Sequence, residues 1–152
     1  MLPLYPMSET NRIIFSQISE DEISSYGILC RNYSQYSIKA ILDGKIVGFI
    51  VFDERPLDIK VCKGDSEKII KYKKMLNSHP SVYLRSIRFD KELRYTGMLE
   101  DMFDYAVRRL PPFALVWCYP NVWDVNNYIM QIGGFAPPMY NLHRRFLLYS
   151  LN

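Results

Sequence analysis

The fold of this chain is decided by residues 82–109, VYLRSIRFDKELRYTGMLEDMFDYAVRR, in which an apolar strand passes through a turn containing Gly97 into an amphipathic helix. The helix is predicted by the spacing of Met102, Phe103 and Ala106 along one face. The first backbone N–H groups of a helix have no partner within it, and the helix dipole places about half a positive charge there. The sequence therefore predicts an anion site at this turn, of the kind that holds a phosphate.

The chain before this stretch predicts two strands joined as a hairpin. Residues 36–42 and 45–53 are apolar and β-branched, and Asp43-Gly44 between them is a strong signal for a tight antiparallel turn. An earlier strand at 12–18 is followed by Ser19 and Glu22, whose spacing predicts a capping box at the start of a short helix.

The remaining sequence completes an alternation of strands and helices without an internal repeat. Residues 54–80 turn polar and contain a predicted helix at 66–76, and we interpret this excursion as a helical insertion between two strands. Further strands are predicted at 82–90, 113–119 and 146–151, and further helices at 97–109 and 124–132. The sequence thus predicts one mixed sheet flanked by helices.

Composition limits the classes of protein to consider. A chain of 152 residues that is 49% hydrophobic is long enough for one domain, residues 1–152, and too short for two ordinary ones. The net charge of +3 comes from scattered basic residues and does not indicate nucleic-acid binding. No apolar run approaches the ~20 residues of a membrane helix. Three cysteines without metal-ligand spacing or a signal sequence predict reduced thiols, a cytoplasmic location and no metal site.

The segment that follows Phe89 resembles motif A of the GNAT superfamily, the acyl-CoA-dependent N-acyltransferases. In that family an Arg/Gln-x-x-Gly-x-Gly/Ala loop wraps the pyrophosphate of coenzyme A with backbone N–H groups. Arg94 and Gly97 match this pattern, whereas Tyr95 and Leu99 stand where the family usually has small residues. The resemblance implies that acetyl-CoA is bound by Arg94, Tyr95, Thr96, Gly97, Met98 and Leu99.

Residues 117–135, WCYPNVWDVNNYIMQIGGF, are similar to the next GNAT segment, which ends in a Gly-Phe pair. In the family an Asn of this segment bonds the pantetheine arm, and here Asn121, Asn126 and Asn127 are the candidates. The implied fold is α/β (α+β), with a single mixed, mostly antiparallel sheet whose splayed central strands are flanked by helices.

The resemblance also implies direct attack of an amine on the thioester, so that no covalent nucleophile is needed. A backbone N–H near the end of the cofactor strand would polarise the carbonyl, by position at Arg88 or Phe89, and the backbone of Ile87 would help hold pantetheine. Many family members protonate the leaving thiolate with a Tyr at the position that Met130 occupies here. Tyr128 and Tyr119 are therefore the candidate acids.

The candidate base is a water relay or a loop carboxylate, namely Glu20, Asp21, Asp53 or Glu54. We expect an acetyl-CoA-dependent N-acetyltransferase that acts on a primary amine. One alternative is a GNAT-fold structural or interaction module without catalysis, which Tyr95, Leu99 and Met130 favour, and another is a CoA-binding sensor. An edge strand also permits a homodimer without specifying it.

Overall fold

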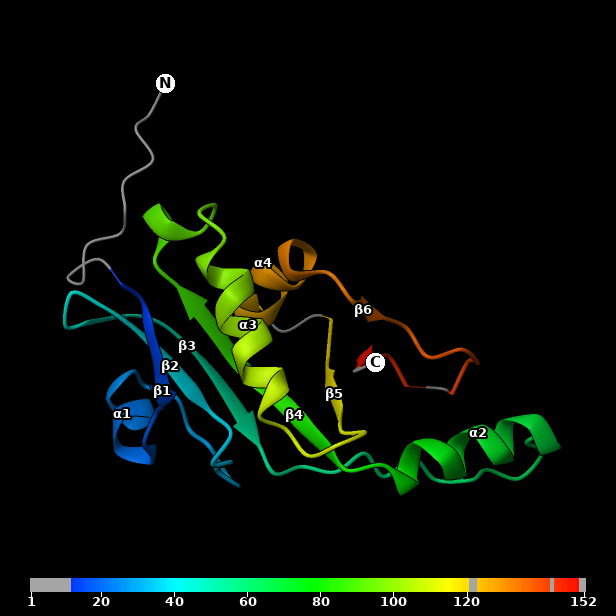
Figure 1. Cartoon of the computed structure of the whole chain (residues 1–152). Coiled ribbons are helices and arrows are strands. Elements are labelled where there is room, and N and C mark those ends of the chain that lie inside the picture. The colour runs from blue at the N-terminus through cyan, green and yellow to red at the C-terminus, as the bar shows by residue number, and fades with distance from the viewer. Residues whose placement is uncertain (1–11, 121–122, 143, 151–152) are drawn as a thin grey trace.

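The computed structural model describes residues 12–120, 123–142 and 144–150. Its centre is a seven-stranded sheet of order β1-β2-β3-β4-β5-β7-β6, in which β4 and β5 are parallel and every other neighbouring pair is antiparallel. Figure 1 shows α3 crossing one face of this sheet, with α2 extending beyond the starting end of β4. The predicted mixed, mostly antiparallel sheet is confirmed.

The amino-terminal elements follow the local signals in the sequence. They are β1 (Ile14–Gln17), α1 (Glu20–Ser25), β2 (Ile38–Leu42) and β3 (Lys45–Asp53). Asp43 and Gly44 both have positive φ, 52° and 76°, as a tight two-residue hairpin turn requires. Ser19 Oγ accepts from the Glu22 amide at 3.1 Å and Glu22 Oε1 accepts from the Ser19 amide at 2.9 Å, so the predicted capping box is present.

The central part of the chain contains α2 (Glu67–Ser78), β4 (Ser81–Phe89), a short 3₁₀ helix η2 (Lys91–Leu93), α3 (Met98–Arg108) and β5 (Leu115–Cys118). The predicted strand at 113–119 is too long at its start, because Phe113 has φ 63° and is exposed. Likewise, β2 begins two residues later than predicted. The carboxyl-terminal elements are α4 (Trp123–Ile132), β6 (Phe135–Ala136) and β7 (Leu147–Ser150), of which the sequence did not predict β6.

A β-bulge interrupts β4 at its middle. Val51 pairs with Ser86 and Phe52 pairs with Leu84, so Arg85 is the extra residue on β4. The pairing of β4 with β5 ends at Tyr83 and Trp117, although β4 continues to Phe89. The two parallel strands therefore separate after the first three pairs, and within the part of the chain that the structure describes, residues 84–89 have no strand neighbour on that side.

The sheet separates one large apolar core from two smaller ones. The large core lies between the sheet and α3 and includes Ile50, Phe52, Leu84, Ile87, Leu99, Met102 and Phe103. On the other face, one cluster lies beneath α1 and includes Ile18, Ile23, Phe49 and Val51. A second cluster lies beneath α2 and includes Leu57, Ile59, Leu76, Tyr83, Trp117 and Phe146.

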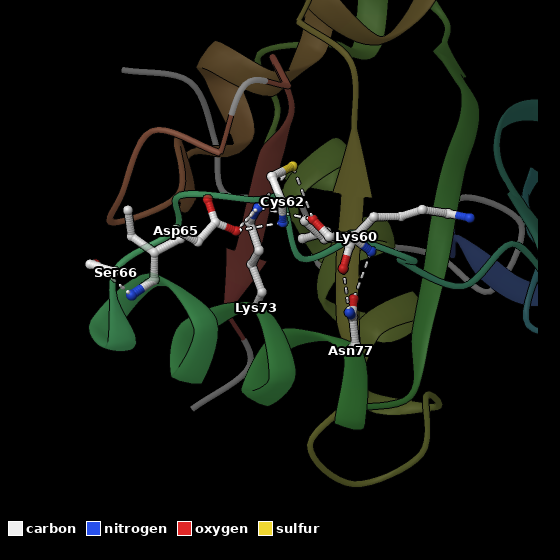
Figure 2. Close-up of polar contacts among 8 residues, drawn as sticks. Lys60, Cys62, Asp65, Ser66, Lys73 and Asn77 are labelled. Atoms are coloured by element: carbon white, nitrogen blue, oxygen red, sulfur yellow. Dashed lines mark hydrogen bonds and ion pairs between the residues drawn. The ribbon is translucent and has the colours of Figure 1, made fainter.

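Polar contacts join α2 to the segment that precedes it, as Figure 2 shows. The Lys73 ammonium is 2.7 Å from Asp65 Oδ2 and donates to the Lys60 carbonyl at 2.9 Å, and both ionic side chains are almost completely buried. The Asn77 amide donates to the Ile59 carbonyl at 2.7 Å and accepts from its amide at 2.8 Å. That residues 54–80 are an insertion stays a prediction.

Among the helices of the described residues, none combines the length and the apolar character that crossing a bilayer requires.

Candidate functional site

The amino end of α3 presents unpaired backbone amides to open space. Gly97 precedes the helix with φ 89°, a left-handed conformation that favours glycine, and a Cβ placed there would meet nothing within 4 Å. Within the described residues, the amides of Leu99 and Glu100 have no hydrogen-bond partner, while that of Met98 is 3.5 Å from Thr96 Oγ1. This turn has the donors and the space that an anionic group needs.

The residues around Gly97 keep their side chains out of this space or bind them locally. Leu99 is completely buried in the core beneath α3, so its bulk lies away from its own amide. Tyr95 is 83% exposed. Thr96 Oγ1 donates to the Leu93 carbonyl at 2.6 Å and thereby stabilises the turn. Leu99 therefore occupies its position without closing the turn.

Arg94 connects the turn to α4. Its Nε donates to Gln131 Oε1 at 2.8 Å, and a second nitrogen contacts the Asn127 carbonyl. Its guanidinium carbon lies 4.8 Å from the centre of the Tyr128 ring. Gln131 in turn donates to Glu100 Oε1 at 3.0 Å. The Arg94 guanidinium, which the sequence predicts to bind a pyrophosphate, therefore also links the turn to α4.

The hydroxyl of Tyr128 lies on the backbone at the end of β4. It accepts from the Phe89 amide and donates to the Phe89 carbonyl, each at 3.2 Å. These two hydrogen bonds, which we call the Tyr128 latch, bring one candidate acid to one of the two predicted carbonyl-polarising amides. The contact spans 39 residues of sequence, which is why no local pattern predicts it.

Amide directions along β4 distinguish the predicted backbone donors. The Asp90 amide donates to the Val47 carbonyl at 2.7 Å, toward β3. Amide directions alternate along a strand, so the Arg88 amide also points toward β3. The amides of Phe89 and Ile87 point toward the side from which β5 has separated. The backbones of Phe89 and Ile87 therefore face the splay, and that of Arg88 does not.

The other residues named from the sequence lie in different places. Asn126 is exposed on α4, and Asn121 lies outside the described residues. Met130 is 86% exposed and so does not fill the splay. The Tyr119 hydroxyl accepts from Arg144 Nη2 at 3.2 Å, and its ring packs 5.4 Å from that of Trp117, in the cluster beneath α2. The second candidate acid is thus on the opposite face of the sheet from α3.

A cavity of about 540 Å³ opens on that opposite face, beside the bulge of β4. Its wall is formed by the loop after α1, the end of β3 and the middle of β4, and includes Arg31, Asn32, Asp53, Arg55, Tyr83 and Arg85. Of the four loop carboxylates considered from the sequence, Asp53 is buried in this wall, whereas Glu20, Asp21 and Glu54 are exposed. Sequence reasoning did not identify the arginines, because three separate segments bring them together.

The thiol of Cys30 is the hydrogen-bond partner of Asp53 Oδ1, at 2.5 Å. Burial, and then this contact with the Asp53 carboxylate, raise the pKa of Cys30 to about 12. The thiol therefore stays protonated at neutral pH and serves as a donor to Asp53 rather than as a nucleophile.

Comparisons with known proteins support the fold. Neither a scan of family models nor a search of curated proteins finds a match to this sequence. Among solved structures, the chain is similar to PH1933 from Pyrococcus horikoshii OT3, with a TM-score of 0.51, 13% identity, and coverage of 93% of this chain and 99% of that one. It is also similar to Naa50 from Arabidopsis thaliana, solved with the bisubstrate analogue CoA-Ac-MVNAL, with a TM-score of 0.51, 11% identity, and coverage of 92% and 98%. Together with the splayed parallel strands and the strand-turn-helix at Gly97, these likenesses show that the chain has the fold of the GNAT superfamily.

Proposed function

We propose that this protein is an acetyl-CoA-dependent N-acetyltransferase that acts on a primary amine. The observation that carries the proposal is the separation of β4 from β5 directly after Tyr83, which leaves the amides of Ile87 and Phe89 facing the splay beside the open amino end of α3. The likeness to Naa50, whose structure contains a CoA-based bisubstrate analogue, supports the same proposal.

The backbone amides at the start of α3 and at the end of β4 suit acetyl-CoA, the proposed acyl donor. We assign the amides of Met98, Leu99 and Glu100 to the pyrophosphate, because they are the first amides of α3 and a Cβ at Gly97 would meet nothing within 4 Å. The backbones of Ile87 and Phe89 are placed for the pantetheine arm and the acyl carbonyl. Acetyl-CoA, when bound, supplies a thioester whose carbonyl is the electrophile.

Catalysis then needs charge stabilisation and two proton transfers. An amide that faces the splay polarises the carbonyl as negative charge develops on its oxygen. Tyr128 Oη, which already donates to the end of β4, is placed to protonate the departing thiolate. Asp53 is buried in the wall of the cavity and pairs with Tyr83, several residues before Ile87 on β4, and we assign it to take the proton of the acceptor amine through a water relay.

Titration with acetyl-CoA in a calorimeter tests the cofactor site without knowledge of the acceptor. We expect micromolar binding by the wild type and none by Gly97→Asp, because a carboxylate at this turn repels the pyrophosphate and the left-handed φ of 89° tolerates Asp better than most side chains. Asp104→Asn, at an exposed position on α3, is the control and should bind normally. Unchanged binding by folded Gly97→Asp would refute the assignment of the turn.

A second candidate function is a GNAT-fold module without catalysis. It is favoured by the contacts that already occupy the site, since Tyr128 uses the Phe89 amide and Arg94 is bound to α4. Absence of binding at millimolar acetyl-CoA would support this candidate and exclude the transferase.

A further inference from the structure

The cavity beside the bulge of β4 has a strongly cationic wall. Arg31, Arg55 and Arg85 converge on a volume of about 540 Å³ that contains one carboxylate, Asp53. Among the described residues, none of the three arginines forms an ion pair. Asp53 directs Oδ1 to the Cys30 thiol. Three guanidinium groups and one carboxylate leave the cavity with a net positive charge.

Arg55 is held in place by aromatic rings, and Arg85 lies at the bulge of β4. The guanidinium of Arg55 lies 5.1 Å from the centre of the Tyr83 ring and 5.7 Å from that of Trp117. The carbonyl of Arg55 accepts from Trp117 Nε1 at 2.9 Å, which fixes its backbone as well. Arg85 is the bulged residue of β4, and a bulge changes the direction of the strand at one position. A guanidinium that lies over aromatic rings keeps its N–H edges available, so Arg55 is pre-organised for an anion.

The cavity also adjoins the position where an acceptor would react. Tyr83 and Arg85 line it, and β4 begins to separate from β5 directly after Tyr83. A small molecule in the cavity therefore lies beside the point at which the splay begins. The arginines also disfavour a protonated amine, and only the neutral amine can attack a carbonyl.

We propose that the acceptor is a small primary amine that carries a carboxylate or phosphate, and that Arg31, Arg55 and Arg85 bind this anionic group. This inference rests on the proposed acetyltransferase function and names its substrate class. Polyamines and other polycationic acceptors are excluded by the same charge.

Matched acceptors test the inference through turnover. β-Alanine is compared with propylamine, and 2-aminoethyl phosphate with 2-aminoethanol, by following the release of CoA thiol. We expect kcat/KM to be about tenfold or more higher for the anionic member of a pair, because a hydrogen bond to a charged group contributes this much. The better anion identifies the group as carboxylate or phosphate. Faster turnover of the neutral amines, or of spermidine, would overturn the inference and leave the transferase intact.

Substitution of one cavity arginine tests whether the cavity causes the preference for anionic acceptors. Arg85→Met should lower kcat/KM more for the anionic member of each pair than for the neutral member, and so abolish the preference. Arg108→Met is the matched control, since Arg108 is exposed on α3 and paired with Asp104 at 3.0 Å, and it should keep the preference. An Arg85→Met variant that is folded and keeps the full preference would contradict the assignment.

Direct binding separates failure of the inference from failure of the proposed function. In calorimetric titrations of the protein without acetyl-CoA, we expect β-alanine or 2-aminoethyl phosphate to bind, with affinity lowered about tenfold or more by Arg85→Met. Such binding without turnover of any acceptor would support the anion site and refute the transferase. If neither compound binds and neither is preferred in turnover, the inference is wrong.

Discussion

Tyr128 joins the two elements that carry the proposed cofactor site. Its hydroxyl forms both hydrogen bonds of the Tyr128 latch with Phe89, and its ring lies beneath the Arg94 guanidinium. Met130, at the position where the family resemblance places the acid, is exposed and has no ionisable group. We therefore propose that the acid is Tyr128, two positions before Met130 on α4, because its side chain reaches the end of β4.

Tyr128→Phe should separate turnover from binding. Loss of the proton donor is expected to lower kcat about 10²-fold, whereas the affinity for acetyl-CoA should be unchanged or higher because the latch is gone. Steady-state kinetics and calorimetric titration of the same preparations measure the two effects. Tyr119→Phe is the control, since its hydroxyl is bound to Arg144 on the other face of the sheet. Equal losses of kcat in the two variants would contradict the role of Tyr128.

A buried ion pair joins α2 to the segment that precedes it. The Lys73 ammonium contacts Asp65 Oδ2, the Lys60 carbonyl and Cys62 Sγ at 2.7, 2.9 and 3.6 Å. The hydrogen bond with Asp65 raises the pKa of Lys73 above its ordinary value, so the ammonium stays charged although the side chain is buried. This ammonium compensates the Asp65 carboxylate, which also accepts from the Cys62 amide at 2.7 Å.

Lys73→Met should lower the thermal midpoint by several degrees, because it removes one partner of a buried ion pair. Lys74→Met, one residue further along α2 and exposed, should leave the midpoint unchanged. Circular dichroism follows both variants during heating, and trypsin cleavage after Lys60 or Lys63 reports on the segment that precedes α2. Identical melting of the two variants would show that the pair does not stabilise α2.

Elements with short-range signals were predictable from the sequence, whereas the site depends on distant contacts. The hairpin at Asp43-Gly44 and the cap at Ser19 follow from residues within a few positions of each other. The bulge at Arg85 depends on the register between β3 and β4, which no local pattern specifies. The arginine cavity likewise combines three segments, and β6 has only two residues, too few to give a period.

Buried thiols make the free energy of unfolding of the molecule depend on pH in the alkaline range. Burial raises the pKa of Cys118 from 9.0 to about 12, and burial together with Asp53 raises that of Cys30 to about 12 as well. In the unfolded chain these thiols ionise near their ordinary pKa, so unfolding releases protons above it. The free energy of unfolding should therefore be fully retained below pH 9 and should fall between pH 9 and 12.

Urea unfolding at pH 8, 9 and 10 and constant ionic strength measures this slope. Cys118→Ala should lower stability at pH 8 because it leaves a cavity in the core, but it should also flatten the decline above pH 9. Cys62→Ser, at an exposed cysteine, should keep the wild-type slope. A Cys118→Ala variant with the full wild-type slope would show that another group causes the decline.

The Tyr128 latch affects how tightly the protein would bind an acyl donor. If the donor needs the Phe89 amide, it binds only the fraction of molecules in which the hydroxyl has left, and the apparent dissociation constant equals the intrinsic constant divided by that fraction. A latch open about 1% of the time would weaken apparent affinity about a hundredfold. Two hydrogen bonds from one hydroxyl would thus raise the concentration of acyl donor that half-saturates the protein, so that turnover would be slow wherever the donor is scarce.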